Sequence, residues 1–367
     1  MNALTQNRQV FLSLVLSLTA LLMFGTIMVA SAASALSGNY LNKHLVYLAL
    51  AIGIGLIVAL VPMRIWPKLY LLGWFGSLAI AVAVLIPGVG HEVNGATRWL
   101  RVGGLTLQAS ELAKFGLMLY LAGYLYRHEA RLIEKPVSIF WPVLMVTVVA
   151  AVLVAAPDLG SSAVILCAAM ALLFIAGAKL RYFLIMLLVM AAVIALLILF
   201  EPFRMQRLTA FINPWAVPFD GGYQLVQALI AFGRGGVFGL GLGESVQKLH
   251  YLPEAHNDFI FAVVAEELGG IGAICLLGLF MFFVLKIFSV AKTSLESGKI
   301  FAGYACYFVG LTFALQFLVN VGVNTGMLPT KGLTLPFISY GGNSLLISCA
   351  MVGLVLRAAL VDEADHG

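Results

Sequence analysis

Residues 251–287 read YLPEAHNDFIFAVVAEELGGIGAICLLGLFMFFVLKI, a polar cluster followed by a long apolar run. The run from Phe259 onward exceeds the about 20 apolar residues that a helix needs to cross the hydrocarbon core of a membrane. Two carboxylates, Glu266 and Glu267, lie within it. Because charge inside a membrane-length segment is costly, these residues are expected to face a bundle interior and to have partners there. The stretch predicts a membrane-spanning helix with a polar cluster at one end.

The composition of the whole chain agrees with a membrane protein. Of its 367 residues, 62% are hydrophobic and 10% are charged, whereas a soluble domain has about 25% charged residues. A soluble fold has no way to bury this much apolar surface, so the solvent is a bilayer. The net charge of +5 is spread over short breaks between apolar runs. This pattern is typical of the positive-inside bias of membrane proteins and does not indicate a nucleic-acid partner.

Ten apolar segments are candidates for membrane spans. They cover residues 11–33, 44–63, 67–87, 111–127, 137–156, 161–178, 182–200, 259–287, 300–325 and 336–359. An even number puts both termini on one side, and the Lys and Arg residues of the short loops place that side in the cytoplasm. The sequence predicts an all-α polytopic membrane protein with one transmembrane domain over 1–367 and a short cytoplasmic tail at 360–367. One large extracytoplasmic loop, 201–258, is expected between the seventh and eighth helices.

Two parts of this loop have distinct patterns. Residues 221–232 have apolar side chains at helical spacing, which predicts a short helix lying on the membrane or re-entering it. Residues 233–245 are rich in glycine, which favours a hinge or a close approach of the backbone to a ligand. A nucleotide site is not expected, because the loop faces outward and lacks both a Gly-Lys-Ser/Thr sequence and a preceding soluble strand.

Asp258 is the strongest candidate for chemistry on the outer side. Asp also suits the N-cap of the helix expected to start near Phe259, so both a capping and a chemical role are open. A place at an apolar boundary raises the pKa of a carboxylate toward the value that a general base needs. If the segment is extended, Glu254, His256 and Asp258 share one face and are placed to hold a divalent cation or relay a proton. A lone His-x-Asp is weak evidence for a metal site.

Other polar residues lie at predicted helix ends. Glu111 and Lys114 follow Ser110 at the start of the fourth segment, where an i,i+3 ion pair stabilises a helix or shapes a cavity. Asp158 lies in a short break between two apolar runs. It is either a helix cap or a polar group of an outer cavity.

The segment NGATRWLRVG at 94–103 places Arg98 and Arg101 at the outer surface. Arginine binds phosphate and pyrophosphate well, so these side chains either contact such a group or lie in a solvated loop. With the acids above, they indicate an outward-facing polar cavity with no nucleotide and no redox centre, so neither haem nor flavin is expected. The residues alone do not choose between transport and catalysis.

Five blocks of sequence resemble the SEDS family of bacterial cell-wall proteins, named for shape, elongation, division and sporulation. In chain order they are NGATRWLRVGGLTLQASELAK (94–114), APDLGSS (156–162), INPWAVPFDGGYQLVQALIAFGRGG (212–236), YLPEAHNDFIFAVVAEELG (251–269) and NTGMLPTKGLTLPFISYGGNSLL (324–346). The family has a division branch of FtsW type and an elongation branch of RodA type. The wording LPTKGLTLPFISYGG, together with Ala255, is more similar to the division branch. Asn257 and Asn343 stand where the family usually has Thr and Ser, and both keep a hydrogen-bonding side chain.

The resemblance implies a peptidoglycan glycosyltransferase of the bacterial inner membrane, acting at the division septum. Its substrate would be lipid II, polymerised into glycan strands on the outer face with inversion at the anomeric carbon. Asp258 matches the family's key acid and is the expected general base. The leaving pyrophosphate requires neutralisation by a divalent cation, Mg²⁺ or Mn²⁺, or by outer cations. The candidate cations are Arg98, Arg101, Lys248 and Lys331.

The resemblance also assigns expected roles to residues around Asp258. Glu111 and Lys114 are expected to form a polar pair in a central cavity. The remaining candidates for substrate binding or for lining the cavity are Asp158, Glu254, His256 and Ser339. Glu266 and Glu267 are expected to organise the eighth helix without taking part in catalysis.

The expected partners, besides lipid II and the growing glycan strand, are membrane proteins of cell division. They are a class B penicillin-binding protein, an FtsI-like transpeptidase, and proteins resembling FtsQ, FtsL, FtsB and FtsN. Three alternatives remain: a lipid II flippase, a scaffold for partner proteins and a RodA-like elongation polymerase. A flippase would depend on polar groups at the membrane midplane, and a scaffold would tolerate a neutral substitution of Asp258.

Overall fold

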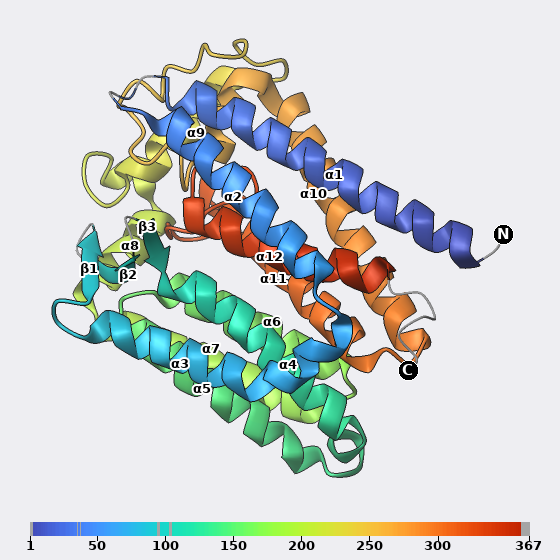
Figure 1. Ribbon diagram of the computed structural model, residues 1–367. Coiled ribbons are helices and arrows are strands. Elements are labelled where there is room, and N and C mark those ends of the chain that lie inside the picture. The colour runs from blue at the N-terminus through green and yellow to red at the C-terminus, as the bar shows by residue number, and fades with distance from the viewer. Residues whose placement is uncertain (1–2, 35, 37, 94–95, 103–104, 361–367) are drawn as a thin grey trace.

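The computed structural model describes residues 3–34, 36, 38–93, 96–102 and 105–360 (Figure 1). The α-helices are α1 (Ala3–Ala32), α2 (Tyr40–Leu60), α3 (Tyr70–Leu85), α4 (Ala109–Glu134), α5 (Phe140–Ala155), α6 (Leu159–Ile175), α7 (Leu180–Leu199), α8 (Pro202–Ile212), α9 (Tyr223–Gly235), α10 (Ile260–Glu296), α11 (Ile300–Asn324) and α12 (Gly342–Leu360). Short 3-10 helices are η1 (Met63–Leu69), η2 (Pro136–Ile139) and η3 (Pro214–Ala216), and the strands are β1 (Gly90–Val93), β2 (Ala96–Val102) and β3 (Leu105–Gln108). The predicted cytoplasmic tail lies, beyond Leu360, outside the described residues.

Each of the ten predicted spans overlaps one of the long helices, α1 to α7 or α10 to α12. In the described part of the chain, eight helices are long and apolar enough to cross a membrane. They correspond to α1, α2, η1 with α3, η2 with α5, α7, α10, α11 and α12. The other two are α6, which has 17 residues, and α4, which carries Glu111 and Lys114 near its start. The helical membrane fold is confirmed, and the number of crossings stays a prediction.

The helices form a bundle around α11, which packs against α4, α6, α10 and α12. Outside this centre, α2 packs along α12 and α3 along α4. The start of α1 and the end of α12 lie at one end of the bundle, and the strands lie at the opposite end (Figure 1). This arrangement agrees with the predicted placement of both termini on one side. The cytoplasmic identity of that side stays a prediction.

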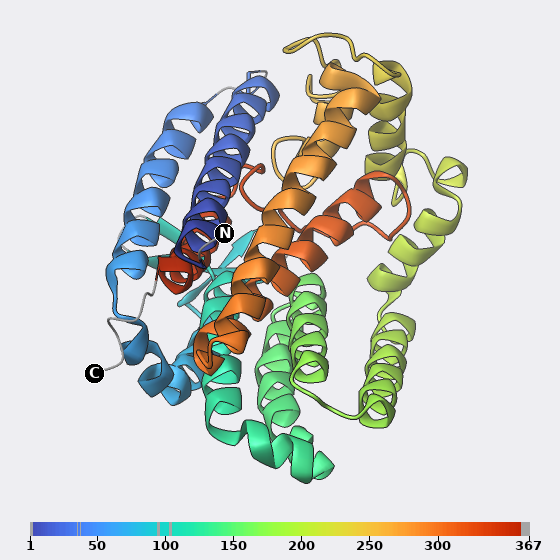
Figure 2. The same cartoon turned by 90° about the vertical axis from the view of Figure 1, so that its right-hand side faces the viewer.

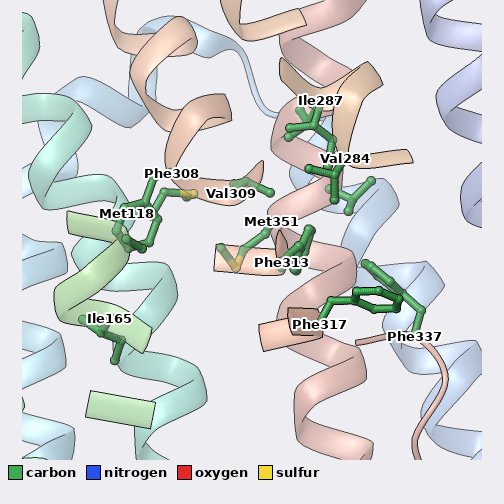
Figure 3. Packing of buried hydrophobic residues seen from close by; sticks show 14 of the residues in the cluster. Met118, Ile165, Val284, Ile287, Phe308, Val309, Phe313, Phe317, Phe337 and Met351 are labelled. Atoms are coloured by element: carbon green, nitrogen blue, oxygen red, sulfur yellow. The ribbon is translucent and has the colours of Figure 1, made fainter. Parts of the chain in front are cut away.

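Aromatic packing in the core fixes the segment between α11 and α12. Phe337 packs edge-on against Phe283 of α10 and Phe313 of α11, with ring centroids 5.5 and 5.1 Å apart (Figure 3). Phe337 has a left-handed φ of 67°, and a Cβ on Gly25 of α1 would lie only 2.2 Å from its carbonyl oxygen. The buried ring and the small glycine therefore hold segment 325–341 inside the bundle, against the residues that precede α10.

A three-stranded antiparallel sheet stands where the sequence analysis predicted a loop. The strands follow the order β1-β2-β3, and Trp99 lies opposite Gln108 while Arg101 lies opposite Thr106. The sequence contained signals for it, namely the strand-forming residues Thr97, Trp99 and Val102 and the Asn-Gly and Gly-Gly pairs on either side of ATRWLRV. The all-α prediction is therefore correct for the spans and wrong for this segment.

The large outer loop contains α8, η3, α9 and an irregular stretch that leads to α10 (Figure 2). The helix predicted at 221–232 is confirmed as α9. The glycine loop, residues 236–243, approaches another helix and not a ligand site. Gly239 has a φ of 80°, and a Cβ on it would lie 2.2 Å from the carbonyl oxygen of Glu267. At this level α10 is broken by Gly269, which has a φ of 69° and a ψ of −171°.

Candidate active site at the outer end of α10

Asp258 lies at the junction between the outer loop and α10. The helix begins at Ile260 with Phe259 in the N-cap position, and no side chain caps it. Within the described ranges, the Asp258 carboxylate forms neither a hydrogen bond nor an ion pair. The capping role left open by the sequence is therefore not the one that the structure gives this residue. Its carboxylate oxygens are available for chemistry.

The backbone of Asp258 is held by two buried asparagines of α11. Asn320 and Asn324 each donate an Nδ2 hydrogen bond of 2.9 Å to the Asp258 carbonyl oxygen. Asn320 also donates to the carbonyl oxygen of Leu333 at 2.7 Å, and Asn324 accepts a hydrogen bond from the Ala262 amide at 3.1 Å. Because both amide side chains are almost fully buried, they fix the backbone from which the carboxylate extends.

The surroundings of Asp258 bring its pKa close to neutrality. Burial and the nearby Glu254 carboxylate raise the pKa of Asp258 to about 7, against the opposing effect of Arg98 and Arg207. Burial also lowers the pKa of Arg207, and Arg98 adds to that effect while Asp258 opposes it. Asp258 and the two arginines are therefore electrostatic neighbours. A carboxylate with a pKa of about 7 is suited to take a proton at neutral pH.

The segment between α11 and α12 forms one wall of the site. A Cβ on Gly332 would lie 2.9 Å from Oδ2 of Asp258, so the missing side chain leaves room for the carboxylate. Arg207 Nη1 donates a hydrogen bond of 3.4 Å to the carbonyl oxygen of Thr330. Lys331 lies between these two contacts and is partly buried. Lys331 therefore belongs to the segment that forms this wall, and its expected role as a cation for the pyrophosphate stays a prediction.

Ser339 and His256 hold the backbone around Asp258 and do not contact its carboxylate. Ser339 Oγ donates to the carbonyl oxygen of Asn257 at 2.6 Å, and the Tyr340 amide donates to the carbonyl oxygen of His256 at 2.9 Å. The His256 ring packs against Tyr40 and Tyr340, with centroid distances of 5.3 and 5.5 Å, and the two tyrosine rings also contact each other at 5.4 Å. Burial lowers the pKa of His256, an effect that Glu254 opposes. These contacts make both residues part of the support of the site.

The expected metal triad is not assembled. Glu254 has a left-handed φ of 55° and begins a turn, so the extended segment that would align Glu254, His256 and Asp258 does not form. The Glu254 carboxylate instead accepts a 2.6 Å hydrogen bond from Asn257 Nδ2. Among the described residues, no group of three or more His, Cys, Asp or Glu side chains is placed to hold a metal ion. The participation of a divalent cation, Mg²⁺ or Mn²⁺, stays a prediction.

Two other predicted polar groups occupy buried positions. Glu111 and Lys114 form the expected i,i+3 ion pair, 2.7 Å long and almost fully buried at the start of α4. Asp158 caps α6, because its Oδ1 accepts from the Ser161 amide at 3.3 Å. Its Oδ2 accepts from Gln108 Nε2 of β3 at 3.3 Å. Of the two alternatives for Asp158, the structure shows the cap, and this cap also joins the sheet to α6.

The two arginines of β2 have different surroundings. Arg98 is partly buried, donates to the carbonyl oxygen of Pro157 and acts electrostatically on Asp258. Arg101 is exposed. Residues three apart on a strand point to opposite faces. Arg98 therefore acts on Asp258, while the expected role of Arg101 in binding the pyrophosphate stays a prediction.

Lys248 is not an outer cation as the sequence analysis expected. Its Nζ is buried and lies 2.9 Å from Oε1 of Glu267, 3.0 Å from Oγ of Ser31 and 2.7 Å from the carbonyl oxygen of Gly243. Glu266 likewise accepts from Ser245 Oγ and from the amides of residues 246 and 247. As expected, the two glutamates organise α10, and Lys248 belongs to their network because a buried carboxylate needs a partner.

Sequence reasoning missed Arg207, Asn320 and Asn324 as members of the site. Arg207 lies on α8, far from Asp258 along the chain, so no spacing rule connects them. Asn320 and Asn324 are four residues apart in an apolar helix and share one face. Uncharged amides inside a span are a weaker signal than carboxylates, but this spacing was the available clue.

Comparison with known proteins identifies the family of the chain. A family model described as cell cycle protein, of the FtsW, RodA and SpoVE type, matches residues 12–363. The chain belongs to this family. A relative in Coxiella burnetii, named probable peptidoglycan glycosyltransferase FtsW, is 44% identical over 361 residues, covering 95% of this chain and 96% of the relative. A relative of the same name in Thioalkalivibrio sulfidiphilus is 46% identical over 355 residues, covering 94% and 88% of the two chains.

Solved structures of this family share the fold. A chain from a structure on coordination of polymerization and crosslinking by a peptidoglycan synthase complex superimposes with a TM-score of 0.79 at 29% identity, covering 94% of this chain and 96% of that one. The rod shape determining protein RodA of Thermus thermophilus gives a TM-score of 0.71 at 29% identity, covering 94% and 95% of the two chains. The higher identity to relatives named FtsW agrees with the predicted likeness to the division branch.

Proposed function

We propose that the chain is a peptidoglycan glycosyltransferase that polymerises lipid II, with Asp258 as its general base. One observation carries the proposal. A carboxylate with a pKa of about 7 and no structural hydrogen bond in the described residues lies beside two arginines at the outer end of a membrane helix. Membership of the FtsW/RodA/SpoVE family and the names of the FtsW relatives support this reaction class.

In the proposed reaction, the 4-hydroxyl of the acceptor N-acetylglucosamine attacks the anomeric carbon of the donor sugar. The new glycosidic bond forms as the bond from that carbon to the pyrophosphate oxygen breaks, and the configuration inverts. Asp258 accepts the hydroxyl proton. The asparagine pair of α11 and the small Gly332 set the position of the carboxylate, because catalysis by a base depends strongly on its placement.

The leaving undecaprenyl pyrophosphate needs compensation for its negative charge. Arg98 and Arg207 are the cations that act electrostatically on Asp258, and guanidinium groups bind phosphate oxygens in a bidentate manner. Lys331 lies on the neighbouring wall and is a third candidate. The described residues offer no ligand set for a divalent cation, so the proposed steps use only these side chains.

The proposed setting is the outer face of the bacterial inner membrane at the division septum. A lipid-linked substrate keeps its tail in the bilayer, which explains why its polymerase is a membrane protein with a site at the membrane boundary. The proposed partner is a class B penicillin-binding protein, and the likeness to a chain of a peptidoglycan synthase complex supports it. Divisome membrane proteins resembling FtsQ, FtsL, FtsB and FtsN are further proposed partners.

The test is polymerisation of purified lipid II in liposomes that contain the chain and its cognate transpeptidase, with Mg²⁺ or Mn²⁺ present and with a chelator in a parallel series. The wild type is compared with Asp258→Asn, which keeps the shape of the side chain and removes its basicity. Partner binding and thermal unfolding establish that the variant is folded. Gly233→Ala serves as a matched control, because a Cβ on Gly233 meets nothing within 4 Å.

Glycan strands from the wild type and the control, and none from folded Asp258→Asn, would support the assignment. Equal polymer from wild type and Asp258→Asn would remove Asp258 from the mechanism. If neither protein forms polymer while both move lipid II across the bilayer, the chain is a flippase. Activity lost with the chelator alone would show that a cation enters with the substrate.

A further inference from the structure

The glycine loop, residues 236–243, is an uncharged apolar segment of the outer loop. It reads GVFGLGLG and has no charged residue, while Arg234 and Glu244 stand close to its two ends. Its large side chains are strongly exposed: Phe238 is 82% exposed, and Val237 and Leu242 are 61% and 56% exposed. Water does not stabilise such a cluster of exposed apolar side chains, so the segment needs an apolar neighbour.

The backbone of the glycine loop is hydrogen-bonded to α10 at the break in that helix. The amides of Leu240 and Gly241 donate to the carbonyl oxygens of Glu266 and Glu267, both at 3.0 Å. In the opposite direction, the amides of Gly270 and Ile271 donate to carbonyl oxygens of the loop. The acceptors are Gly236 at 2.9 Å and Val237 at 3.2 Å. Non-helical backbone is compatible with membrane depth only where its polar groups are satisfied by protein or water. These four bonds meet that condition.

The depth of the glycine loop in the membrane follows from the length of α10. Lys286 is the first cation below the break and marks the inner end of its apolar stretch. From Gly270 to Lys286 the helix rises about 24 Å, which is less than the about 30 Å of a hydrocarbon core. Because the glycine loop pairs with Gly270 itself, it lies at the outer edge of the core. The chain between α9 and α10 accordingly runs along the outer end of α10 (Figures 1 and 2).

The exposed side of the loop continues the lipid-facing side of α10. Below the break, Ile271, Ile274, Met281 and Leu285 are all exposed and recur at helical spacing. They form the stripe that a membrane helix turns toward lipid. The amide of Ile271 bonds directly to Val237 of the loop, so the stripe and the exposed loop residues are one continuous apolar surface.

We propose that the glycine loop is inserted into the outer leaflet and contacts lipid acyl chains there. Phe238, Val237 and Leu242 are the contacting side chains, and the glycines let the backbone pair with α10 at this level. The loop thereby anchors the segment that leads to Asp258 at the membrane surface. This inference does not depend on the proposed enzymatic activity, because insertion is a property of the folded chain.

The test measures the surroundings of a single nitroxide or fluorophore label in liposomes. Phe238→Cys is labelled in a background whose four native cysteines are replaced by alanine. Two matched sites frame the result: native Cys275, which is exposed on α10, and His91→Cys, which is exposed on β1 beside Glu92. Quenching by lipids labelled on the acyl chain is compared with quenching by a water-soluble quencher.

The expected result is that a label at residue 238 behaves like one at Cys275, with strong quenching from lipid and several-fold weaker quenching from water than at His91→Cys. Aqueous quenching equal to that at His91→Cys would overturn insertion. Aqueous exposure that disappears only when a transpeptidase is added would make the loop a protein interface and would also overturn it. If the cysteine-free background does not fold, Phe238→Trp in the native sequence, read by brominated lipids against wild type, answers the same question.

Discussion

Asp258 and Glu267 are two carboxylates at the same end of the same helix with opposite surroundings. Glu267 is fully buried and is surrounded by donors, with hydrogen bonds from Ser31 and Ser245 and an ion pair to Lys248. Asp258 has no donor among the described residues, and burial together with Glu254 raises its pKa to about 7. A carboxylate with every oxygen occupied stabilises the fold, whereas one that is desolvated and unoccupied is ready to accept a proton.

The largest expected effect is the loss of polymerisation activity when Asp258 is substituted. Asp258→Asn is expected to lower the rate of glycan polymerisation by about 10²- to 10⁴-fold, the usual contribution of a general base. The thermal unfolding midpoint is expected to stay unchanged, because the carboxylate supports no contact in the described fold. Both quantities are measured on the same liposome preparation. A lower midpoint in step with the lost activity would show that Asp258 is structural, as Glu267 is.

The next largest effect is the loss of stability when Glu267 is left without its cation. Lys248→Met leaves Glu267 buried without its cation and is expected to cost about 3–5 kcal/mol of unfolding free energy. The double variant Lys248→Met, Glu267→Gln is expected to recover part of this loss, because no unpaired charge remains. Unfolding by denaturing detergent checks both. If Lys248→Met keeps its stability and loses polymerisation, Lys248 serves the substrate, as the sequence analysis had suggested.

A smaller effect is expected when the Asp258 carboxylate is displaced without being removed. A Cβ on Gly332 would lie 2.9 Å from Oδ2 of Asp258, so Gly332→Ala must displace one of the two groups. Because small misplacements of a catalytic group are costly, kcat is expected to fall roughly tenfold to hundredfold with little change in stability. Steady-state kinetics check this, with Gly233→Ala as the control. Unchanged kcat would mean that the position of the carboxylate is not critical.

The smallest effect concerns the pH dependence. Protonated Asp258 is inactive as a base, so kcat/KM of the wild type should rise with pH through about 7. Arg207 lowers the pKa of Asp258 and Glu254 raises it. Arg207→Gln should therefore move this rise to higher pH, and Glu254→Gln should move it to lower pH.

The matched control for these pH profiles is Arg101→Gln, since Arg101 is exposed on β2. Its profile is expected to superimpose on that of the wild type. Shifts of Arg207→Gln and Glu254→Gln in the same direction would show that the observed rise does not report the ionisation of Asp258.

The helices were predictable because bilayer thickness sets a length of apolar sequence that is visible without tertiary information. The sheet was missed because its strands are short and carry Arg98 and Arg101, which resemble a solvated loop when read as charges. The better signal was the pair of turn-forming dipeptides, Asn-Gly and Gly-Gly, on either side of a segment that contains Thr97, Trp99 and Val102.

The site was predictable only in part, for a different reason. Asp258 was predictable because it lies at an apolar boundary, which raises the pKa of a carboxylate, and because it matches the key acid of the family that the sequence resembles. Lys248 was predicted to belong to the site but pairs with Glu267, whereas Arg207 was not predicted but lies near Asp258. Which carboxylate each cation reaches depends on the three-dimensional fold, and no local sequence pattern contains that information. Buried cations follow buried anions, so assignments of surface cations from sequence need the fold.

The asparagine pair of α11 has a consequence for how such a site meets successive substrates. Asn320 and Asn324 of the central helix α11 hold the backbone of Asp258 by hydrogen bonds. The glycine loop, residues 236–243, is instead hydrogen-bonded to α10 at the break in that helix. Asp258 and the glycine loop are therefore held by different sets of hydrogen bonds. Polymerisation requires the outer loop to admit and release a chain that grows by one disaccharide at each turn. Movement of the glycine loop would leave Asp258 in place, because the hydrogen bonds that hold its backbone come from α11.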